Sequence, residues 1–448
     1  MSTTTTSSFS TPESQWPQGL SETGDGRARR GRPDWTDLVF FLLLAAGAGY
    51  ALVHYSGAMD YYEKTILCAA VPVAAWMGWL WRPLRRLMIA CALSAGLAVM
   101  LYGNDLGRAE QVFFLKYLFS SQSAILWMSA LFALATVCYW IGVFSPTAAW
   151  LGTALTWGAV FAGLTGLLVR WREGHLMGPD LGHIPVSNLY EVFVLFSLIT
   201  ALFYLYYERK YATRALGGFV LLVVTSAVVF LLWYSFTRDA GQIQPLVPAL
   251  KSWWMKLHVP ANFIGYGTFS LAAMVGFAYL VKQHGNTASW ARLAPLFVLG
   301  VLLCAEPMVF RTDGLSATWM LYFGIGAVIV GAILLGRRRI AAALPSLEVL
   351  DDIMYRAIAV GFAFFTVATI LGALWAADAW GAYWQWDPKE TWALIVWLNY
   401  AAWLHMRLIK GLRGAMAAYW ALTGLLITGF AFLGVNMFLS GLHSYGQL

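Results

Sequence analysis

The chain has 448 residues, of which 60% are hydrophobic, 16% aromatic and only 11% charged, and its mean hydropathy is +0.65. An ordinary soluble domain carries roughly 25% charged residues, and a soluble globule of this length could not cover its surface with so few. The composition therefore excludes a soluble enzyme, a nucleic-acid-binding protein and a disordered scaffold, although the net charge is +7.

Apolar stretches near the roughly 20 residues that cross a bilayer as a helix recur along most of the sequence. Residues 1–35 precede them, lack the apolar segment and cleavage site of a signal peptide, and are predicted to form a disordered cytoplasmic tail. Helices are expected elsewhere because a backbone in lipid must satisfy its own hydrogen bonds. The pattern predicts an all-α polytopic membrane protein with about thirteen transmembrane helices. The predicted spans are 37–57, 65–81, 87–103, 124–144, 148–169, 192–207, 216–235, 261–281, 294–310, 317–335, 357–377, 392–409 and 416–439.

Basic residues predict the orientation of these spans, because cytoplasmic loops carry an excess of Lys and Arg. With thirteen spans, five basic clusters fall on one side of the membrane, which explains the positive net charge. The N-terminus is then cytoplasmic and the C-terminus outside. The clusters are Arg27 to Arg32, Arg82 to Arg86, Arg209 to Arg214, Arg337 to Arg339, and Arg407 to Arg413. The connections assigned to the outer side are 104–123, 170–191, 236–260 and 378–391, with the tail from Ser440.

One outer connection is dense in tryptophan, since residues 375–397 read WAADAWGAYWQWDPKETWALIVW. An aromatic belt at the membrane interface explains part of this density but not the WGAYWQW cluster. The cluster offers indole faces on which a large flat apolar ligand such as a porphyrin could stack. The belt residues are Trp375, Trp392 and Trp397, and the cluster residues are Trp380, Trp384 and Trp386.

The polar residues that follow this cluster have the form of a helix start. Asp387 is a candidate N-cap, Pro388 would be the first helical residue, and Glu390 would stand at the third position of a capping box. Because capping explains both carboxylates, neither is assigned a chemical role.

The segment WGAYWQWDPKETW resembles the WWD signature of the haem-handling proteins of cytochrome c biogenesis. Four further stretches are similar, in the same order, to the CcsA (ResC) branch of these proteins: GHIPVSNLYE at 182–191, LVPALKSWWMKLHV at 246–259, LHMR at 404–407 and GVNMFLSGLHSYG at 434–446. The resemblance implies a CcsA-like haem-handling membrane domain over 170–448, in which 294–335 is an inserted hairpin. It leaves 36–169 as an N-terminal membrane region of unassigned role.

Two histidines, His258 and His443, lie level with the tryptophan cluster on the predicted topology. Two imidazoles that approach a porphyrin from opposite faces give six-coordinate iron. The resemblance implies that both are axial ligands of a haem iron held against the tryptophans. The alternative is a pair of interfacial histidines bonded to water or backbone.

A third histidine, His405, lies toward the cytoplasmic end of the twelfth predicted span, and an ionisable residue at membrane depth is a functional candidate. In the CcsA family the histidine of the LHxR motif ligates a second haem inside the membrane, and the resemblance implies this role for His405. The alternative is a helix-terminal histidine that bonds a carbonyl group. The matched region offers no partner histidine, and His54 lies at the wrong depth, so the second ligand is expected from another chain.

The predicted outer connections contain further histidines and several cationic residues. His175 and His183 share the connection 170–191 and are expected to be solvated. The alternative for His183, which belongs to the family-like stretch GHIPVSNLYE, is a role in shaping the outer vestibule. Haem carries two propionates, so a cationic side chain is expected near its polar edge. The sequence does not rank the candidates, which are Arg238, Lys251, Lys256, Arg311 and Lys389.

The resemblance implies cytochrome c biogenesis of the System II type, in the bacterial cytoplasmic (inner) membrane. The protein would bind haem b, move or present it to the outer face, and support its covalent attachment to the CxxCH motif of apocytochrome c. It would be one subunit of a cytochrome c synthase that forms thioethers as a haem lyase does, with a separate CcsB (ResB)-like partner, and no residue is assigned a catalytic role. Two alternatives stay open: a System I-type protein that passes haem to a carrier, and a secondary transporter with an interfacial tryptophan loop.

Overall fold

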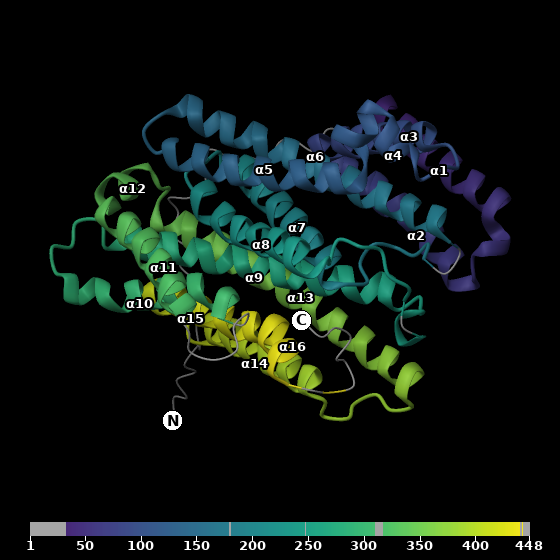
Figure 1. Cartoon of the computed structure of the whole chain (residues 1–448). Helices are drawn as coiled ribbons and strands as arrows, with labels where there is room; N and C mark the ends of the chain where they lie inside the picture. The colour runs from purple at the N-terminus through teal and green to yellow at the C-terminus, as the bar shows by residue number, and fades with distance from the viewer. Residues whose placement is uncertain (1–32, 179–180, 247, 310–316, 440, 442–448) are drawn as a thin grey trace, which may run out of the picture.

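The protein is described by a computed structural model over residues 33–178, 181–246, 248–309, 317–439 and 441 (Figure 1). Within these ranges the chain is helical and contains no β-strand. Short 3₁₀ segments cover Ser56–Ala58 (η1) and Pro248–Leu250 (η3), and π-helical turns cover Leu115–Phe119 (η2) and Phe430–Gly434 (η4). The α-helices are α1 (Trp35–Tyr55), α2 (Tyr61–Leu80), α3 (Arg82–Tyr102), α4 (Arg108–Gln111), α5 (Ser121–Ile141), α6 (Pro146–Met177), α7 (Leu189–Lys210), α8 (Gly217–Arg238), α9 (Met255–Gln283), α10 (Trp290–Val309), α11 (Ala317–Leu335), α12 (Arg337–Ala343), α13 (Leu347–Trp380), α14 (Pro388–Ile409), α15 (Gly414–Gly429) and α16 (Val435–Phe438).

The helices agree with the predicted fold class. Each predicted span coincides with a helix over most of its length. In the described ranges, nine helices are long and apolar enough to cross a membrane, or ten if α11 and α12, which are bent by 65° relative to one another, form one span. The all-α polytopic class is therefore confirmed. The count of thirteen crossings and the side on which each terminus lies stay predictions.

Two predicted outer connections are shorter than expected, because helices continue past the apolar stretches. Helix α6 continues to Met177, although its predicted span ends at residue 169. Glu173 in the added turns is buried but satisfied, since it accepts hydrogen bonds from Tyr102 Oη at 2.6 Å and from Ser121 N at 2.9 Å. Helix α13 likewise continues to Trp380. An apolar pattern ends at the first charged residue, whereas a helix can continue wherever that charge finds partners.

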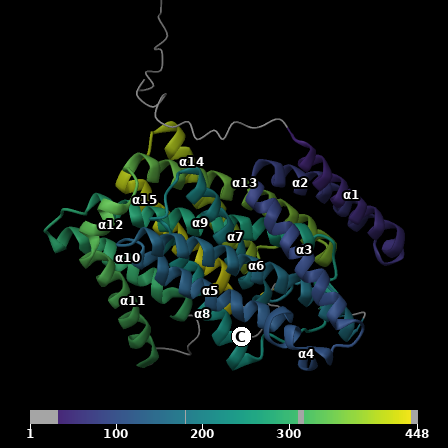
Figure 2. The ribbon, with the colours of Figure 1, turned by 90° about the horizontal axis from the view of Figure 1, so that it is seen from above.

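Helix α9 lies at the centre of the bundle, where it packs against α7, α13 and α15 (Figures 1 and 2). Every residue from 265 to 281 is buried. Helix α13 approaches α9 closely at Gly361, where a Cβ atom would lie 2.4 Å from Thr268 Oγ1, and small residues permit such contacts between helices in membranes. Tyr400 of α14 stacks on Phe269 with ring centroids 3.6 Å apart. These contacts fix α9 relative to α13 and α14.

Helices α1 to α3 lie at the edge of the bundle (Figure 2), and most of α1 is exposed. The start of α2 nevertheless contacts the segment that leads into α9. Tyr62 stacks on Trp253, with ring centroids 4.3 Å apart and 6° between the ring planes. Beside this stack, Glu63 forms an ion pair with Lys256. The N-terminal membrane region therefore supports the start of α9.

Helix junctions that carry basic clusters gather at one end of the bundle, here called the basic end. Trp81, which precedes the Arg82 cluster, lies edge-on to Tyr206 near the end of α7, with ring centroids 5.8 Å apart. Tyr211, just past α7, donates a hydrogen bond at 2.5 Å to Asp352 near the start of α13. The opposite end, where α13 ends and α14 begins, lies toward the right of Figure 1 and is here called the cavity end.

Candidate functional site

A cavity of about 320 Å³ lies at the cavity end, between the first turns of α9 and α14, the last turns of α13 and the start of α7. Its volume falls in the range of roughly 300–1,000 Å³ that small-molecule sites occupy. Apolar and aromatic side chains form most of its wall, and a few polar groups converge on it. The lining side chains that matter most for its chemistry are His258, Trp375, Trp380, Trp384, Lys389 and Glu390.

His258 lies near the start of α9, and its ring is oriented by α13. Its Nδ1 lies 2.8 Å from the carbonyl oxygen of Ala368. Since a carbonyl oxygen only accepts, Nδ1 carries the proton and donates, and the lone pair of the neutral imidazole is then on Nε2. Histidines that ligate metals show this arrangement, in which a hydrogen bond at one ring nitrogen orients the other. In this orientation Nε2 is the ring nitrogen of His258 that is able to bind a metal.

Two further residues of α13 hold the imidazole ring in place. Trp375 lies edge-on to it, with ring centroids 5.7 Å apart. At Gly372 a Cβ atom would lie 2.8 Å from Cε1 of His258, so the ring fits only because glycine has no side chain. The assignment of Trp375 to an aromatic belt is wrong, because α13 turns this residue toward α9, where it is only 9% exposed and lines the cavity.

The tryptophan cluster divides between the cavity and the surface. Trp380, the last residue of α13, and Trp384 both line the cavity with His258. Trp386 is not part of that lining, and its side chain is 68% exposed. Its ring lies edge-on to Trp384, with centroids 6.0 Å apart. The structure therefore brings two of the three predicted tryptophans together with His258.

The backbone of Trp386 is in the left-handed region, with φ at +58°. A bulky residue adopts this conformation only when its surroundings impose it. Glu390 imposes this conformation on Trp386. Its Oε2 accepts hydrogen bonds from the amide of Gln385 at 2.7 Å and from that of Asp387 at 3.2 Å, on either side of Trp386. The predicted capping box of Asp387 and Glu390 is confirmed. Both carboxylates therefore have a structural role at the start of α14.

Lys389 is the single cationic side chain in the described part of the lining. It precedes the apolar part of α14, and its ammonium group has no ion pair among the described residues. Burial lowers the pKa of Lys389 from 10.5 to about 8, and the neighbouring carboxylate of Asp387 opposes this effect. The other predicted cations lie outside the lining (Arg238, Lys251 and Lys256) or outside the described residues (Arg311).

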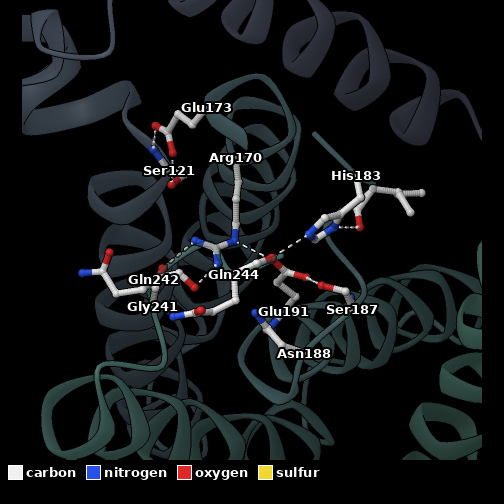
Figure 3. Close-up of polar contacts among 11 residues, drawn as sticks. Ser121, Arg170, Glu173, His183, Ser187, Asn188, Glu191, Gly241, Gln242 and Gln244 are labelled. Carbon is white, nitrogen blue, oxygen red and sulfur yellow. Dashed lines mark hydrogen bonds and ion pairs between the residues drawn. The ribbon is translucent and has the colours of Figure 1, made fainter. Parts of the chain in front are cut away.

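A buried ion pair supports the cavity wall at the start of α7 (Figure 3). Arg170 Nε donates to Glu191 Oε1 at 2.7 Å, and both side chains are at most 2% exposed. The other oxygen of Glu191 accepts from the amide and the hydroxyl of Ser187, at 2.8 and 2.9 Å. Arg170 also donates to the carbonyl oxygens of Gly241 and Gln242, at 2.7 and 3.3 Å. The pair thereby ties the connections before α7 and before α9 to the end of α6.

His183 joins the same two connections (Figure 3). Its ring nitrogens lie 3.1 Å from the carbonyl oxygen of Ile184 and 3.2 Å from that of Gln244. His183 is less solvated than predicted, since its ring is half-buried where the connection before α9 folds back over it. His175 is exposed as predicted, but it belongs to the last turn of α6 and not to a loop.

The intramembrane candidate His405 lies away from this cavity. It is exposed near the end of α14, at the basic end. Two residues later, Arg407 forms a bidentate ion pair with Asp351 of α13, at 2.9 and 2.5 Å, which fixes this end of α14. His54 lies in the last turn of α1, next to the start of α2, and hence at the opposite end from His405.

The predicted second ligand of the outer haem, His443, lies outside the described residues. The nearest described residue before it is Gly441. Gly441 packs against the start of α14, where a Cβ atom on it would lie 2.2 Å from Asp387 Oδ1. The chain therefore reaches the cavity end two residues before His443.

Comparisons with known proteins agree with these features. The profile of a family described as "Cytochrome C assembly protein" matches residues 186–443, which include every histidine and tryptophan proposed as a ligand contact. The chain is also similar to curated proteins named "Cytochrome c biogenesis protein CcsA". It is 34% identical to that of Chlorella vulgaris over 322 residues, which cover 70% of this chain and 93% of the relative. It is 35% identical to that of Synechococcus elongatus over 317 residues (69% and 92%) and to that of Thermosynechococcus vestitus over 331 residues (71% and 94%).

Replacement of Glu191 by Gln keeps the shape of the side chain but removes the charge that pairs with Arg170. An unpaired buried charge costs about 3–5 kcal/mol, so we expect a large fall in the thermal unfolding temperature in detergent. Glu63→Gln is the matched control, because Glu63 pairs with Lys256 where the two side chains are 24% and 27% exposed and such pairs contribute about 1 kcal/mol or less. Equal losses in the two variants would contradict the role given to Arg170.

Replacement of Gly372 by Ala forces the imidazole of His258 to move, since the added Cβ overlaps its ring. Loss of a group that orients a metal ligand weakens metal binding by roughly 10- to 100-fold, and we expect a similar fall in affinity for haem added to the purified protein. Gly324→Ala in α11 is the control, because nothing lies within 4 Å of a Cβ atom there. An unchanged haem affinity in Gly372→Ala would show that α13 does not orient His258.

Proposed function

Because the chain belongs to the CcsA family of cytochrome c assembly proteins, and so takes part in cytochrome c biogenesis, we propose that its cavity holds haem b before attachment to apocytochrome c. His258 and His443 ligate the iron from opposite faces of the porphyrin. Trp380 and Trp384 stack against the ring, and Trp386 forms the outer edge of the same cluster. Haem is the substrate in this proposal.

One observation carries the proposal. An imidazole whose Nδ1 proton is directed to Ala368 lines the same cavity as Trp380 and Trp384. A porphyrin is large, flat and apolar and carries a metal that accepts an imidazole nitrogen, so these groups match its parts. Gly372 and Trp375 hold the imidazole in position, which lowers the ordering cost of binding.

In this proposal, haem held in the cavity reacts with the CxxCH segment of apocytochrome c. Each cysteine of the CxxCH segment adds its S–H bond across one vinyl group: the sulfur bonds to one carbon and the hydrogen goes to the other. A thioether forms without net oxidation, and no atom is lost. The two imidazoles occupy both axial positions of the iron and so exclude oxygen from it. The chain positions the reactants, while the haem supplies the reactive vinyl groups.

We place the cavity end on the outer side of the bacterial inner membrane, because the basic clusters lie at the opposite end and cytoplasmic loops favour Lys and Arg. Haem delivery of the System II type then runs from the basic end toward the cavity. His405, exposed at the basic end, ligates a haem that enters from the cytoplasmic side. A CcsB (ResB)-like second chain supplies the other ligand and completes the synthase, to which apocytochrome c binds from outside.

Replacement of His258 by Ala removes one axial ligand while leaving the tryptophans in place. We expect lower haem retention and loss of the low-spin bis-histidine absorption spectrum, with partial recovery of cytochrome c maturation when excess imidazole fills the vacant position. His443→Ala should behave in the same way. His284→Ala is the control, since His284 caps the other end of α9. An unaltered low-spin spectrum in His258→Ala would refute its assignment as a ligand.

Replacement of His405 by Ala tests the direction of transfer. If haem passes from this site to the cavity, His405→Ala must deplete haem at both sites, whereas His443→Ala must leave the inner haem in place. The measurement is haem per mole and the absorption spectrum of each variant, purified with its partner chain. Normal occupancy of the cavity in well-expressed His405→Ala would show that no transfer from His405 takes place.

A further inference from the structure

One side chain in the cavity is suited to recognise the polar edge of the ligand. Among the described lining residues, Lys389 is the single cation and Glu390 the single carboxylate. Glu390 is already engaged, because its Oε2 accepts from two backbone amides in the loop before α14. Asp387 accepts from the amide of Lys389 itself, at 3.1 Å, as the cap of α14. The ammonium group of Lys389 is left without an ion pair in the described chain.

We propose that Lys389 binds a propionate carboxylate of the haem in the cavity, and so makes the site selective for porphyrins with free acid groups. This inference rests on the proposed function. It assigns a ligand-binding role to one lysine, where the sequence offered five equivalent cations. A half-buried ammonium group that lines a cavity is costly to keep charged until an anion arrives. A carboxylate removes this cost and adds a charge-assisted hydrogen bond.

The alternative cations are less suitable for physical reasons. Lys256 is already paired with Glu63 at the contact between α2 and α9, and it does not line the cavity. Arg238 is exposed in the last turn of α8, also outside the lining. Lys389, in contrast, is held by the capping box of α14, so its backbone position relative to Trp384 is fixed by the same hydrogen bonds that shape the tryptophan loop.

The proposal has a defined pH dependence. Burial lowers the pKa of Lys389 to about 8, and a bound carboxylate raises it. The charged form that binds the propionate is therefore present below about pH 8 and lost above it, so the contribution of Lys389 falls as the pH rises through 8. The other titratable side chains that line the cavity or adjoin Lys389 are Tyr234, His258, Tyr266, Tyr383, Asp387 and Glu390. A haem whose propionates are esterified meets these groups equally and serves as the reference ligand.

The test compares haem with haem dimethyl ester, in which both propionates are methylated, on the purified protein and its variants at pH 7. A hydrogen bond between charged groups is worth roughly 10- to 100-fold in affinity, so the natural protein should prefer haem by this factor. Lys389→Met should lose the preference by weakening haem binding alone, with the affinity for the diester unchanged, which also shows that the variant is folded. Lys389→Arg should retain the preference. Lys410→Met, at the exposed far end of α14, is the control and should behave as the natural protein.

The outcomes separate the two proposals. If Lys389→Met prefers haem over the diester as strongly as the natural protein does, the role of Lys389 is refuted while the haem site stands. If the natural protein binds both porphyrins equally well, the cavity does not select propionates and the inference is likewise refuted. If the natural protein binds neither porphyrin, both the proposed function and this inference are refuted.

Discussion

The packing of α13 against α9 is the contact on which the rest of the site depends. Gly361 lets the two helices approach, and about two to four turns later Ala368, Gly372 and Trp375 contact His258. These three residues follow a spacing of four and then three, so they share one face of α13. Ala368 fixes which ring nitrogen of His258 carries the proton, Gly372 leaves space for the ring, and Trp375 holds its orientation. Because every residue of α9 from 265 to 281 is buried, neither helix can shift without disturbing the core.

The cavity is also where the structure departs most from ordinary local preferences. A bulky residue, Trp386, has a left-handed backbone, and an ion pair is buried between Arg170 and Glu191. Lys389 is held where its charge is costly. Each departure is supported by its neighbours: Glu390 fixes the loop at Trp386, and the connections before α7 and α9 close around Arg170. Such concentrated departures are characteristic of functional sites, where stability is given up for position.

Much of this could be predicted from the sequence. Apolar stretches located the long helices, and the pattern from Asp387 to Glu390 located the start of α14 to the residue. His258 is far in sequence from Trp380 and Trp384 but level with them on the predicted topology, and all three line one cavity. These predictions were possible because the signals are local. They are the length of each apolar stretch, the capping residues at a helix start, and the end of the predicted span nearest to each residue.

The other features of the site depend on which face each helix turns toward its neighbours. A single sequence does not contain this information. Trp375 and Trp380 are both near the end of α13, yet an aromatic belt explained the first equally well until its burial against His258 was known. Arg170 directly follows one apolar stretch and Glu191 directly precedes the next. Their opposite charges at these two positions are a signal that could have suggested the ion pair. Gly372 gave no signal, because its role is visible only against the ring of His258. For the same reason Lys389 could not be ranked above four other cations.

The most direct test of the haem site is a cryo-electron microscopy map of the haem-loaded protein in a lipid nanodisc. We expect porphyrin density in the cavity between α9, α13 and α14, with the iron bonded to Nε2 of His258 and with Trp384 against the ring. Porphyrin density elsewhere in the bundle, with the cavity empty and the imidazole of His258 away from the iron, would contradict it.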